Sequence, residues 1–313
     1  MTESYPSYLP LIKDNKFRSR VETAWSWLAE CQLCPRQCKV NRLKGEKGFC
    51  RSTSELVVSS AAPHFGEEAP LVGRRGSGTI FFTNCNLGCI YCQNYDISHL
   101  GCGRQVSIQN LADMMLSLQD LGCHNINLVT PTHFVPQILK ALELAAHQGL
   151  RLPLVYNCGG YESLETLQLL EGIIDIYMPD AKYDNGKISA EYSKALDYPE
   201  AMKAALKEMH RQVGDLVIDD RGIAQRGLLI RHLVLPHNLS GPAGIMRFIA
   251  QDISKNSYVN IMAQYRPAYE ARKYPLLSRS ISREEYQNAL NIARAEGLHR
   301  GFPDADTYWS IYL

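Results

Sequence analysis

The sequence predicts an α/β protein built as a partial (β/α)6 TIM-like barrel, preceded by a small cysteine-rich N-terminal extension. From residue 78 onward, short apolar runs alternate with amphipathic segments, a pattern typical of parallel strands joined by helices. The runs are almost entirely apolar, as expected for strands buried on both faces. Polar residues and glycine follow these runs directly, where ligand sites of barrel folds lie. A doubly wound open sheet is the alternative arrangement.

Six runs are predicted to be strands: 79–83, 126–130, 152–157, 173–178, 227–235 and 258–263. Helices are expected at 108–121, 135–147, 163–170, 199–213, 243–252 and 282–296. In the first of these, Leu111, Met115 and Leu118 recur at helical spacing behind Ser107, a residue type that caps helices. The segment 219–222 predicts a hairpin turn ahead of the fifth strand.

Composition excludes several other classes of protein. The chain has 313 residues, 33 Lys plus Arg against 32 Asp plus Glu, and 45% hydrophobic residues. Disorder requires low hydrophobicity with high net charge, and nucleic-acid binding usually requires a basic excess. No window approaches the roughly 18 apolar residues of a membrane span, and the N-terminus lacks an export signal. We therefore expect a cytoplasmic protein with neither a membrane nor a nucleic-acid partner.

The chain is predicted to have two parts. Residues 1–77 form the extension with a four-cysteine cluster, and a Gly-rich stretch at 73–78 marks the boundary. Residues 78–313 form the barrel with a C-terminal helical tail. Seven of the ten cysteines lie in two short stretches, which favours metal binding over disulfides in a chain without an export signal.

The first cysteine group follows the first barrel strand. Cys85, Cys89 and Cys92 place three thiols within eight residues. A closed ferredoxin-type cluster takes four thiolates, so three leave one iron of a [4Fe-4S] cluster open to a non-protein ligand. A structural zinc ion or buried free cysteines are the alternatives.

This CxxxCxxC segment, with Tyr91 before the last cysteine, resembles the signature of the radical S-adenosylmethionine superfamily. The resemblance implies a [4Fe-4S] cluster that binds S-adenosylmethionine and cleaves it reductively to a 5′-deoxyadenosyl radical. The radical would abstract hydrogen from a protein, peptide or small-molecule substrate. An electron donor such as flavodoxin or ferredoxin is implied as a partner, and Tyr91 is expected beside the cofactor.

The segment 91–96 is similar to the branch that contains pyruvate formate-lyase activating enzyme, where a His-Asn pair follows the third cysteine. Gln93 replaces that histidine here. The resemblance implies an activase that abstracts hydrogen from a glycine of a partner enzyme. Modification of a peptide or metabolite is the rival within the superfamily.

Further cofactor-binding residues are implied at the strand ends. Asp180 and Lys182 after the fourth strand resemble the Asp-x-Lys of activases, which binds the ribose and amino-acid parts of S-adenosylmethionine. Arg231 in the fifth strand resembles an arginine that contacts the cofactor, and an arginine in so apolar a run needs an anionic partner. Thr130 and Thr132 stand where the family has a Gly-Gly-Glu-Pro segment and supply possible acceptors.

The second cysteine group precedes the barrel. Cys31, Cys34, Cys38 and Cys50 are enough to close a zinc site or to hold an Fe–S cluster, and their spacing decides neither. Metal-free cysteines are the remaining alternative. In some activases a ferredoxin-like insert follows the radical motif, whereas this group comes before it.

Four residues are candidates for handling substrate. His64, Glu67 and Glu68 offer binding of a cationic group or proton transfer, and a solvated loop is the alternative. Cys158, at the end of the third strand, is either a hydrogen-atom donor to a radical or a small buried hydrophobe. A hypothesis of another class is a non-catalytic Fe–S or zinc-binding electron carrier or scaffold, which would not need Asp180, Lys182 and Arg231.

Overall fold

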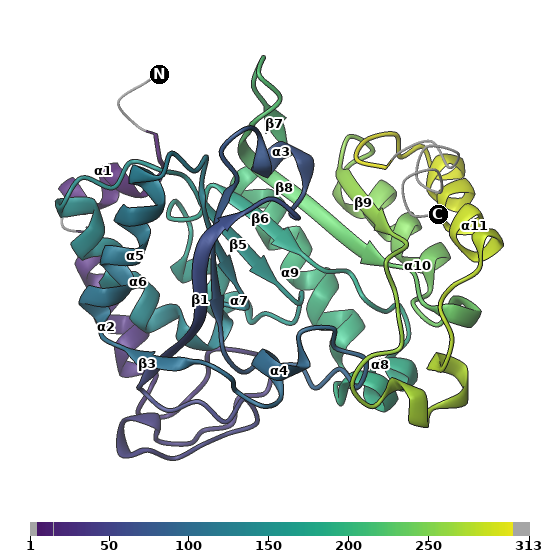
Figure 1. Ribbon diagram of the computed structural model, residues 1–313, viewed down its shortest axis with the longest axis horizontal. Helices are drawn as coiled ribbons and strands as arrows, with labels where there is room; N and C mark the ends of the chain where they lie inside the picture. Colours follow the sequence, from purple (N-terminus) through teal and green to yellow (C-terminus); the bar gives the residue numbers. More distant parts are fainter. Residues whose placement is uncertain (1–4, 15, 303–313) are drawn as a thin grey trace.

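Six parallel strands form the centre of the fold (Figure 1). The computed structural model describes residues 5–14 and 16–302. The parallel strands are β2 (Ser77–Phe82), β4 (Ile126–Val129), β5 (Leu154–Cys158), β6 (Ile176–Pro179), β8 (Ala224–Leu233) and β9 (Tyr258–Met262). In the part of the chain that is described, no pairing joins β9 to β2, so the barrel is open. The predicted α/β class with a partial barrel is confirmed, and all six strands overlap their predicted runs.

Three antiparallel strands extend this sheet: β1 (Leu56–His64), β3 (Arg104–Val106) and β7 (Val217–Ile218). The β7–β8 hairpin turns at the predicted segment 219–222. The prediction missed β1 because only two of its side chains, Leu56 and Val58, are buried, and Pro63 interrupts it. Its last residue, His64, pairs with Ser77 at the start of β2. The β1–β2 loop therefore lies at the N-terminal end of the barrel.

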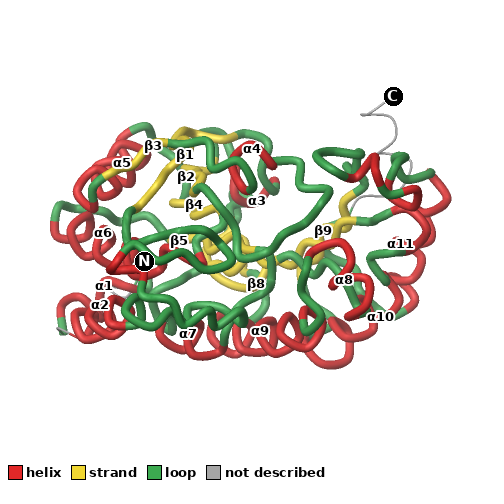
Figure 2. Tube along the Cα trace, turned by 90° about the horizontal axis from the view of Figure 1, so that it is seen from below, coloured by secondary structure: helices red, strands yellow, loops and turns green. Residues whose placement is uncertain are grey.

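Helices surround the strands on their outer side, as Figure 2 shows. The predicted ones are α5 (Ile108–Asp120), α6 (Val135–His147), α7 (Leu164–Leu169), α9 (Tyr198–Val213), α10 (Pro242–Phe248) and α11 (Arg283–Ala295). Five more were not predicted: α1 (Tyr8–Lys13), α2 (Lys16–Ser26), α3 (Ala69–Val72), α4 (Tyr95–Ser98) and α8 (Gly186–Ser193). Ser107 caps α5 as expected, accepting the Asn110 N–H. No helix in the described ranges has the length and apolar character needed to cross a membrane.

Short helical segments complete the chain. Single turns span Arg42–Lys44, Thr132–Phe134, Pro236–Asn238, Ala271–Lys273 and Pro275–Leu277, and a wider helical segment, Ile249–Ile253, continues α10. The expected C-terminal tail includes α11, while residues 303–313 lie outside the described part. The boundary between residues 77 and 78 stays a prediction.

The barrel interior is small and closed at its N-terminal end. Val155, Met178 and Leu229 pack there against Leu71 of α3, whose carbonyl accepts a hydrogen bond of 2.9 Å from the Asn125 amide. Side chains two apart on a strand share a face, so the residues that follow these toward the C-terminal strand ends also point inward. Because the N-terminal end is filled by apolar side chains, a ligand site would lie at the C-terminal ends of the strands.

Candidate active site

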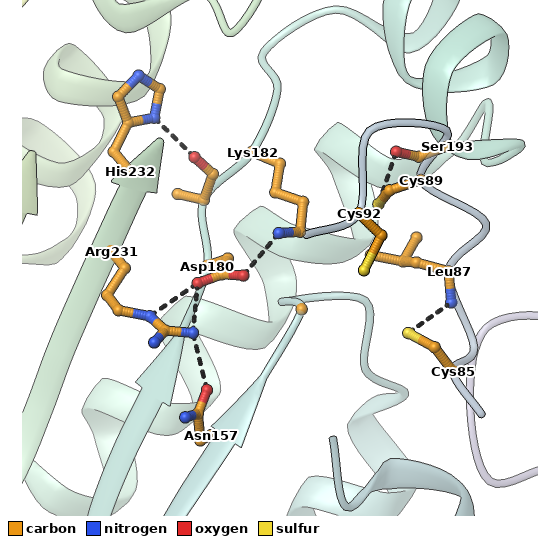
Figure 3. A network of polar contacts seen from close by, with 12 residues as sticks. Cys85, Leu87, Cys89, Cys92, Asn157, Asp180, Lys182, Ser193, Arg231 and His232 are labelled. Carbon is orange, nitrogen blue, oxygen red and sulfur yellow. Dashed lines mark hydrogen bonds and ion pairs between the residues drawn. The ribbon is translucent and has the colours of Figure 1, made fainter. Parts of the chain in front are cut away.

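The loop after β2 carries Cys85, Cys89 and Cys92, and each sulfur has a hydrogen-bond donor; Figure 3 draws those of Cys85 and Cys89. The Leu87 N–H donates to Cys85 Sγ at 3.3 Å. The hydroxyls of Ser193 and Ser98 donate to Cys89 and Cys92 at 3.0 and 3.1 Å. Such donors stabilise thiolate charge, so the donor set fits Fe–S ligation. Among the described residues, no three His, Cys, Asp or Glu side chains are arranged to hold a single metal ion.

Burial governs the ionisation of two of these thiols. It raises the pKa of Cys85 and of Cys89, while the nearby charge of Lys182 lowers both. Without a metal the two side chains are neutral thiols, and coordination would remove their protons. The loop would therefore become more negatively charged when its cysteines coordinate a metal.

Asp180 is the centre of a buried charge network at the end of β6. Its Oδ2 lies 2.6 Å from Lys182 Nζ, and its Oδ1 accepts a 2.8 Å bond from Arg231 Nε. Arg231 Nη2 also donates to Asn157 Oδ1 at 2.8 Å. Burial raises the pKa of Asp180, but the two cations outweigh it and hold the pKa below its ordinary value. The carboxylate is thus ionised and shared by two cations.

Two carboxylates reach this network from the β1–β2 loop. Glu67 Oε2 lies 3.8 Å from Arg231 Nη1, and the Asn260 amide donates to both oxygens of Glu68 at 2.8 and 2.7 Å. Burial raises the pKa of Glu68, opposed by Arg231. The structure therefore brings Glu67 and Glu68 to the predicted cofactor residues. His64 instead lies at the end of β1, with its ring edge-to-face against Phe81.

Thr132 and Cys158 surround a buried acid that the sequence interpretation missed, Glu162. Thr132 and Tyr156 donate to its carboxylate at 2.8 and 3.0 Å, and Cys158 is a further hydrogen-bond partner. Burial raises the pKa of Glu162 to about 7. Because Asn157 points inward to Arg231, the next residue, Cys158, points to the opposite, helix-covered face.

Tyr91 and Thr130 occupy different surroundings. Tyr91 is buried, accepts a 2.5 Å hydrogen bond from the Tyr183 hydroxyl, and packs edge-to-face against Tyr265. Thr130 is half-buried directly after β4 with a left-handed φ of 58°. Tyr183 also hydrogen-bonds Ser193, so Tyr91 is connected through hydroxyls to the donor of Cys89. Neither Ser193 nor Tyr183 belongs to a motif, so no sequence signal could have found them.

The four N-terminal cysteines lie on the same side of the barrel as the loop after β2. Cys31, Cys34, Cys38 and Cys50 line one pocket, which Asn86 of the β2 loop also lines. All ten cysteines of the chain are free thiols. The two cysteine groups are therefore neighbours in space.

Part of the chain matches a family model, and most of it matches a known protein. Residues 79–217 match the model of a family described as Radical SAM superfamily. A protein of Methanocaldococcus jannaschii named uncharacterized protein MJ0674 is 33% identical over 300 residues, covering 93% of this chain and 82% of that protein.

Two solved structures match parts of the chain, and the first of them is similar in fold. SuiB of Streptococcus suis, bound to precursor peptide SuiA, has a TM-score of 0.50 and 11% identity over 74% of this chain and 49% of its own. The FeFe-hydrogenase maturase HydG of Carboxydothermus hydrogenoformans has a TM-score of 0.47 and 15% identity over 70% and 50%. The chain spans about half the length of these two proteins. The chain therefore belongs to the same family as the archaeal protein over most of its length, and its residues 79–217 are a radical SAM superfamily domain.

Proposed function

We propose that this protein is a radical S-adenosylmethionine enzyme in which Cys85, Cys89 and Cys92 ligate a [4Fe-4S] cluster. The observation that carries the proposal is the position of Lys182. Its ammonium is paired with Asp180 and is also close enough to Cys85 and Cys89 to lower the pKa of both thiols. The thiol loop and the charge network therefore form one continuous site.

Within this site the charged side chains bind and orient the cofactor. The Asp180 carboxylate is placed to accept from the amino or ribose groups, and Lys182 and Arg231 to meet the carboxylate of S-adenosylmethionine. Their side chains are only 14–17% exposed, so these interactions form largely out of water. When bound, the cluster and S-adenosylmethionine supply a 5′-deoxyadenosyl radical that abstracts a substrate hydrogen. Tyr91 precedes Cys92 in the loop, and Thr130 and Thr132 follow strand β4.

The enzyme test is anaerobic reconstitution with iron and sulfide, reduction with dithionite, and chromatographic assay of 5′-deoxyadenosine. Cys89→Ala should abolish the nucleoside. Cys102→Ala is the matched control, because Cys102 is exposed and outside the motif, and it should retain activity. A wild-type protein that carries the cluster but fails to bind S-adenosylmethionine in calorimetry would overturn the proposal.

For the substrate we propose a glycine of a partner enzyme, on the resemblance of residues 91–96 to the activase branch. Electron paramagnetic resonance of candidate partner enzymes after incubation would detect a glycyl radical. Absence of the radical in every partner, with nucleoside formation intact, would favour the rival substrate classes, a peptide or a small molecule. Glu67 and Glu68 then offer two carboxylates for a cationic group on that substrate.

For the electron donor we propose an acidic protein such as flavodoxin or ferredoxin, docking beside Cys89. His99 Nε2 donates to the Cys89 carbonyl at 2.9 Å, and the His99 ring stacks on Tyr269 with centroids 4.3 Å apart. Tyr269 stacks in turn on Tyr95, and both tyrosines are over one-third exposed. Burial lowers the pKa of His99, and the nearby cations Arg51 and Lys194 lower it further. An aromatic surface beside cations suits an acidic partner.

A second candidate function, an electron carrier or scaffold without catalysis, is favoured only by the second cysteine group. It predicts a bound metal with no cleavage of S-adenosylmethionine by the reduced protein. The free thiols also suit the reducing cytoplasm, where we place the enzyme.

A further inference from the structure

The N-terminal cysteine pocket is formed by a segment with little regular structure. Between α2 and β1 the chain contains a single helical turn, Arg42–Lys44. Backbone bonds of 3.0 Å join Cys31 N–H to the Val40 carbonyl and Lys39 N–H to the Cys31 carbonyl. Cys31 and Cys34 are buried, and Cys38 and Cys50 are half-buried. Four thiols thus line one pocket of a segment whose fold has few other stabilising elements. Metal binding would have to draw them closer together, because no three of them are arranged to hold a single metal ion as they stand.

Arg42 is the unusual residue of this pocket. It is 1% exposed, and its Nε and Nη2 donate to the Thr53 carbonyl at 3.2 and 2.7 Å. Its Nη1 lies 4.0 Å from Cys31 Sγ. Within residues 5–14 and 16–302, no Asp or Glu forms an ion pair with Arg42. A buried cation without an anionic partner is strongly unfavourable.

Two further contacts suit a loaded pocket. The Phe49 N–H points at Cys38 Sγ at 3.4 Å, the geometry of a donor to thiolate sulfur. A Cβ on the adjacent Gly48 would lie 2.7 Å from the same sulfur, so the glycine keeps the backbone close to it. From the barrel side His133 lines the pocket; its Nε2 bonds the Thr83 carbonyl at 2.8 Å, and its Nδ1 has no partner in the described chain. The lining therefore contains one buried polar atom, His133 Nδ1, that the described protein leaves unsatisfied.

We propose that Cys31, Cys34, Cys38 and Cys50 bind a thiophilic metal centre as four thiolates, and that Arg42 is its buried counter-cation. A zinc ion and an oxidised [4Fe-4S] cluster share this chemistry, because either one bound by four thiolates carries roughly two net negative charges. Such a charge at Cys31 supplies the anionic partner that Arg42 otherwise lacks. The proposal concerns a separate site and does not rest on the proposed function.

The centre would also support the radical loop. Arg36 lies between Cys34 and Cys38 in the chain, and its Nε donates to the Asn86 carbonyl at 3.1 Å. Its Nη2 donates to the carbonyl of Ser193, the residue that also bonds Cys89, and its guanidinium lies 3.7 Å from the Phe49 ring centroid. A metal that orders the segment 31–50 therefore orders the surroundings of Cys85 and Cys89.

The decisive experiment isolates the second site in the full-length chain by replacing Cys85, Cys89 and Cys92 with Ala. One portion is purified with zinc, and another is reconstituted anaerobically with iron and sulfide. Elemental analysis and visible absorption should give either about one zinc or about four iron per chain. No metal in either portion, with circular dichroism showing folded protein, would overturn the site. Cys38→Ala in the same background should lose the metal, and Cys102→Ala should keep it.

The role of Arg42 is tested by competition with a chelator. Arg42→Met should weaken metal binding by roughly 10- to 100-fold, the usual range for a group that supports metal ligands. Arg42→Lys keeps the positive charge and should therefore retain more metal affinity than Arg42→Met. If the Met variant fails to fold, the Lys variant is compared with the wild type instead. Arg104→Met, at an exposed arginine of β3 that does not line the pocket, is the control. Two results would overturn the role of Arg42 as counter-cation. One is a folded Arg42→Met protein with unchanged metal affinity, and the other is an equal loss of affinity in the Met and Lys variants.

Discussion

Lys182 Nζ lies 2.6 Å from Asp180 Oδ2, while Arg231 bonds the other oxygen of the same carboxylate. One anion thus holds two cations that come from different strand ends. Because all three side chains are largely buried, removing the anion leaves two cations without their main partner.

Asp180→Asn should therefore reduce both stability and cofactor binding. We expect the free energy of unfolding to fall by about 3–5 kcal/mol, and affinity for S-adenosylmethionine to fall at least ~10-fold, the effect of one charge-assisted interaction. Denaturant titration and calorimetry measure the two quantities. Asp113→Asn, on the exposed face of α5, should change neither. Wild-type affinity in a folded Asp180→Asn protein would remove Asp180 from the cofactor site.

Glu162 should make stability depend on pH. Its pKa is raised by burial to about 7 from the ordinary 4.5, so the folded state favours the protonated acid. That contribution is fully present below about pH 4.5 and is lost as pH rises through 7. Its total size is on the order of 3 kcal/mol. The difference in unfolding free energy, wild type minus Glu162→Gln, should thus decline between pH 5 and 7 and then level off. A difference that is flat across this range would contradict the prediction.

The Ser193 hydroxyl should tune the cluster. Hydrogen bonds to ligand sulfur stabilise the reduced, more negative state, so Ser193→Ala should lower the reduction potential of the reconstituted protein. A bond of ordinary strength corresponds to about 20–60 mV. Spectroelectrochemical titration measures the shift, and iron content shows whether the cluster still assembles. Ser189→Ala, whose hydroxyl bonds only backbone carbonyls, is the control. An unchanged or higher potential would argue against this role.

Lys194 should affect reduction by a protein donor only. Reversing an exposed charge beside a docking surface chiefly slows association. We expect Lys194→Glu to slow cluster reduction by flavodoxin about 10-fold at low salt, with dithionite reduction unchanged. Stopped-flow absorbance gives both rates, and direct binding of oxidised flavodoxin gives an independent measure. Lys13→Glu on α1 is the control; equal effects of the two variants would show that docking occurs elsewhere.

The sequence was enough to predict the three-cysteine loop and the six parallel strands, because both predictions depend on residues that are close together in the chain. The loop was predicted from the spacing of Cys85, Cys89 and Cys92, and the strands from their apolar runs. The same holds for the Ser107 cap and the 219–222 turn. Local periodicity failed for β1, a half-exposed strand between β3 and β2, and for the short helices α3, α4 and α8. Those elements owe their conformation to what they pack against.

The surroundings of each site were decided by the tertiary structure. The approach of Glu67 to Arg231 depends on how the β1–β2 loop enters the barrel, and the Ser193–Cys89 bond depends on where α8 packs. Thr132 bonds Glu162, a residue in no motif, because β4 and β5 are neighbours in the sheet. The sequence by itself determined the superfamily motif and the strand pattern, because both depend only on residues that are close together along the chain. The tertiary structure decided which charged side chains form ion pairs and which, like Arg42, are buried without one. Both depend on packing between residues far apart in the chain, which no local sequence pattern reveals.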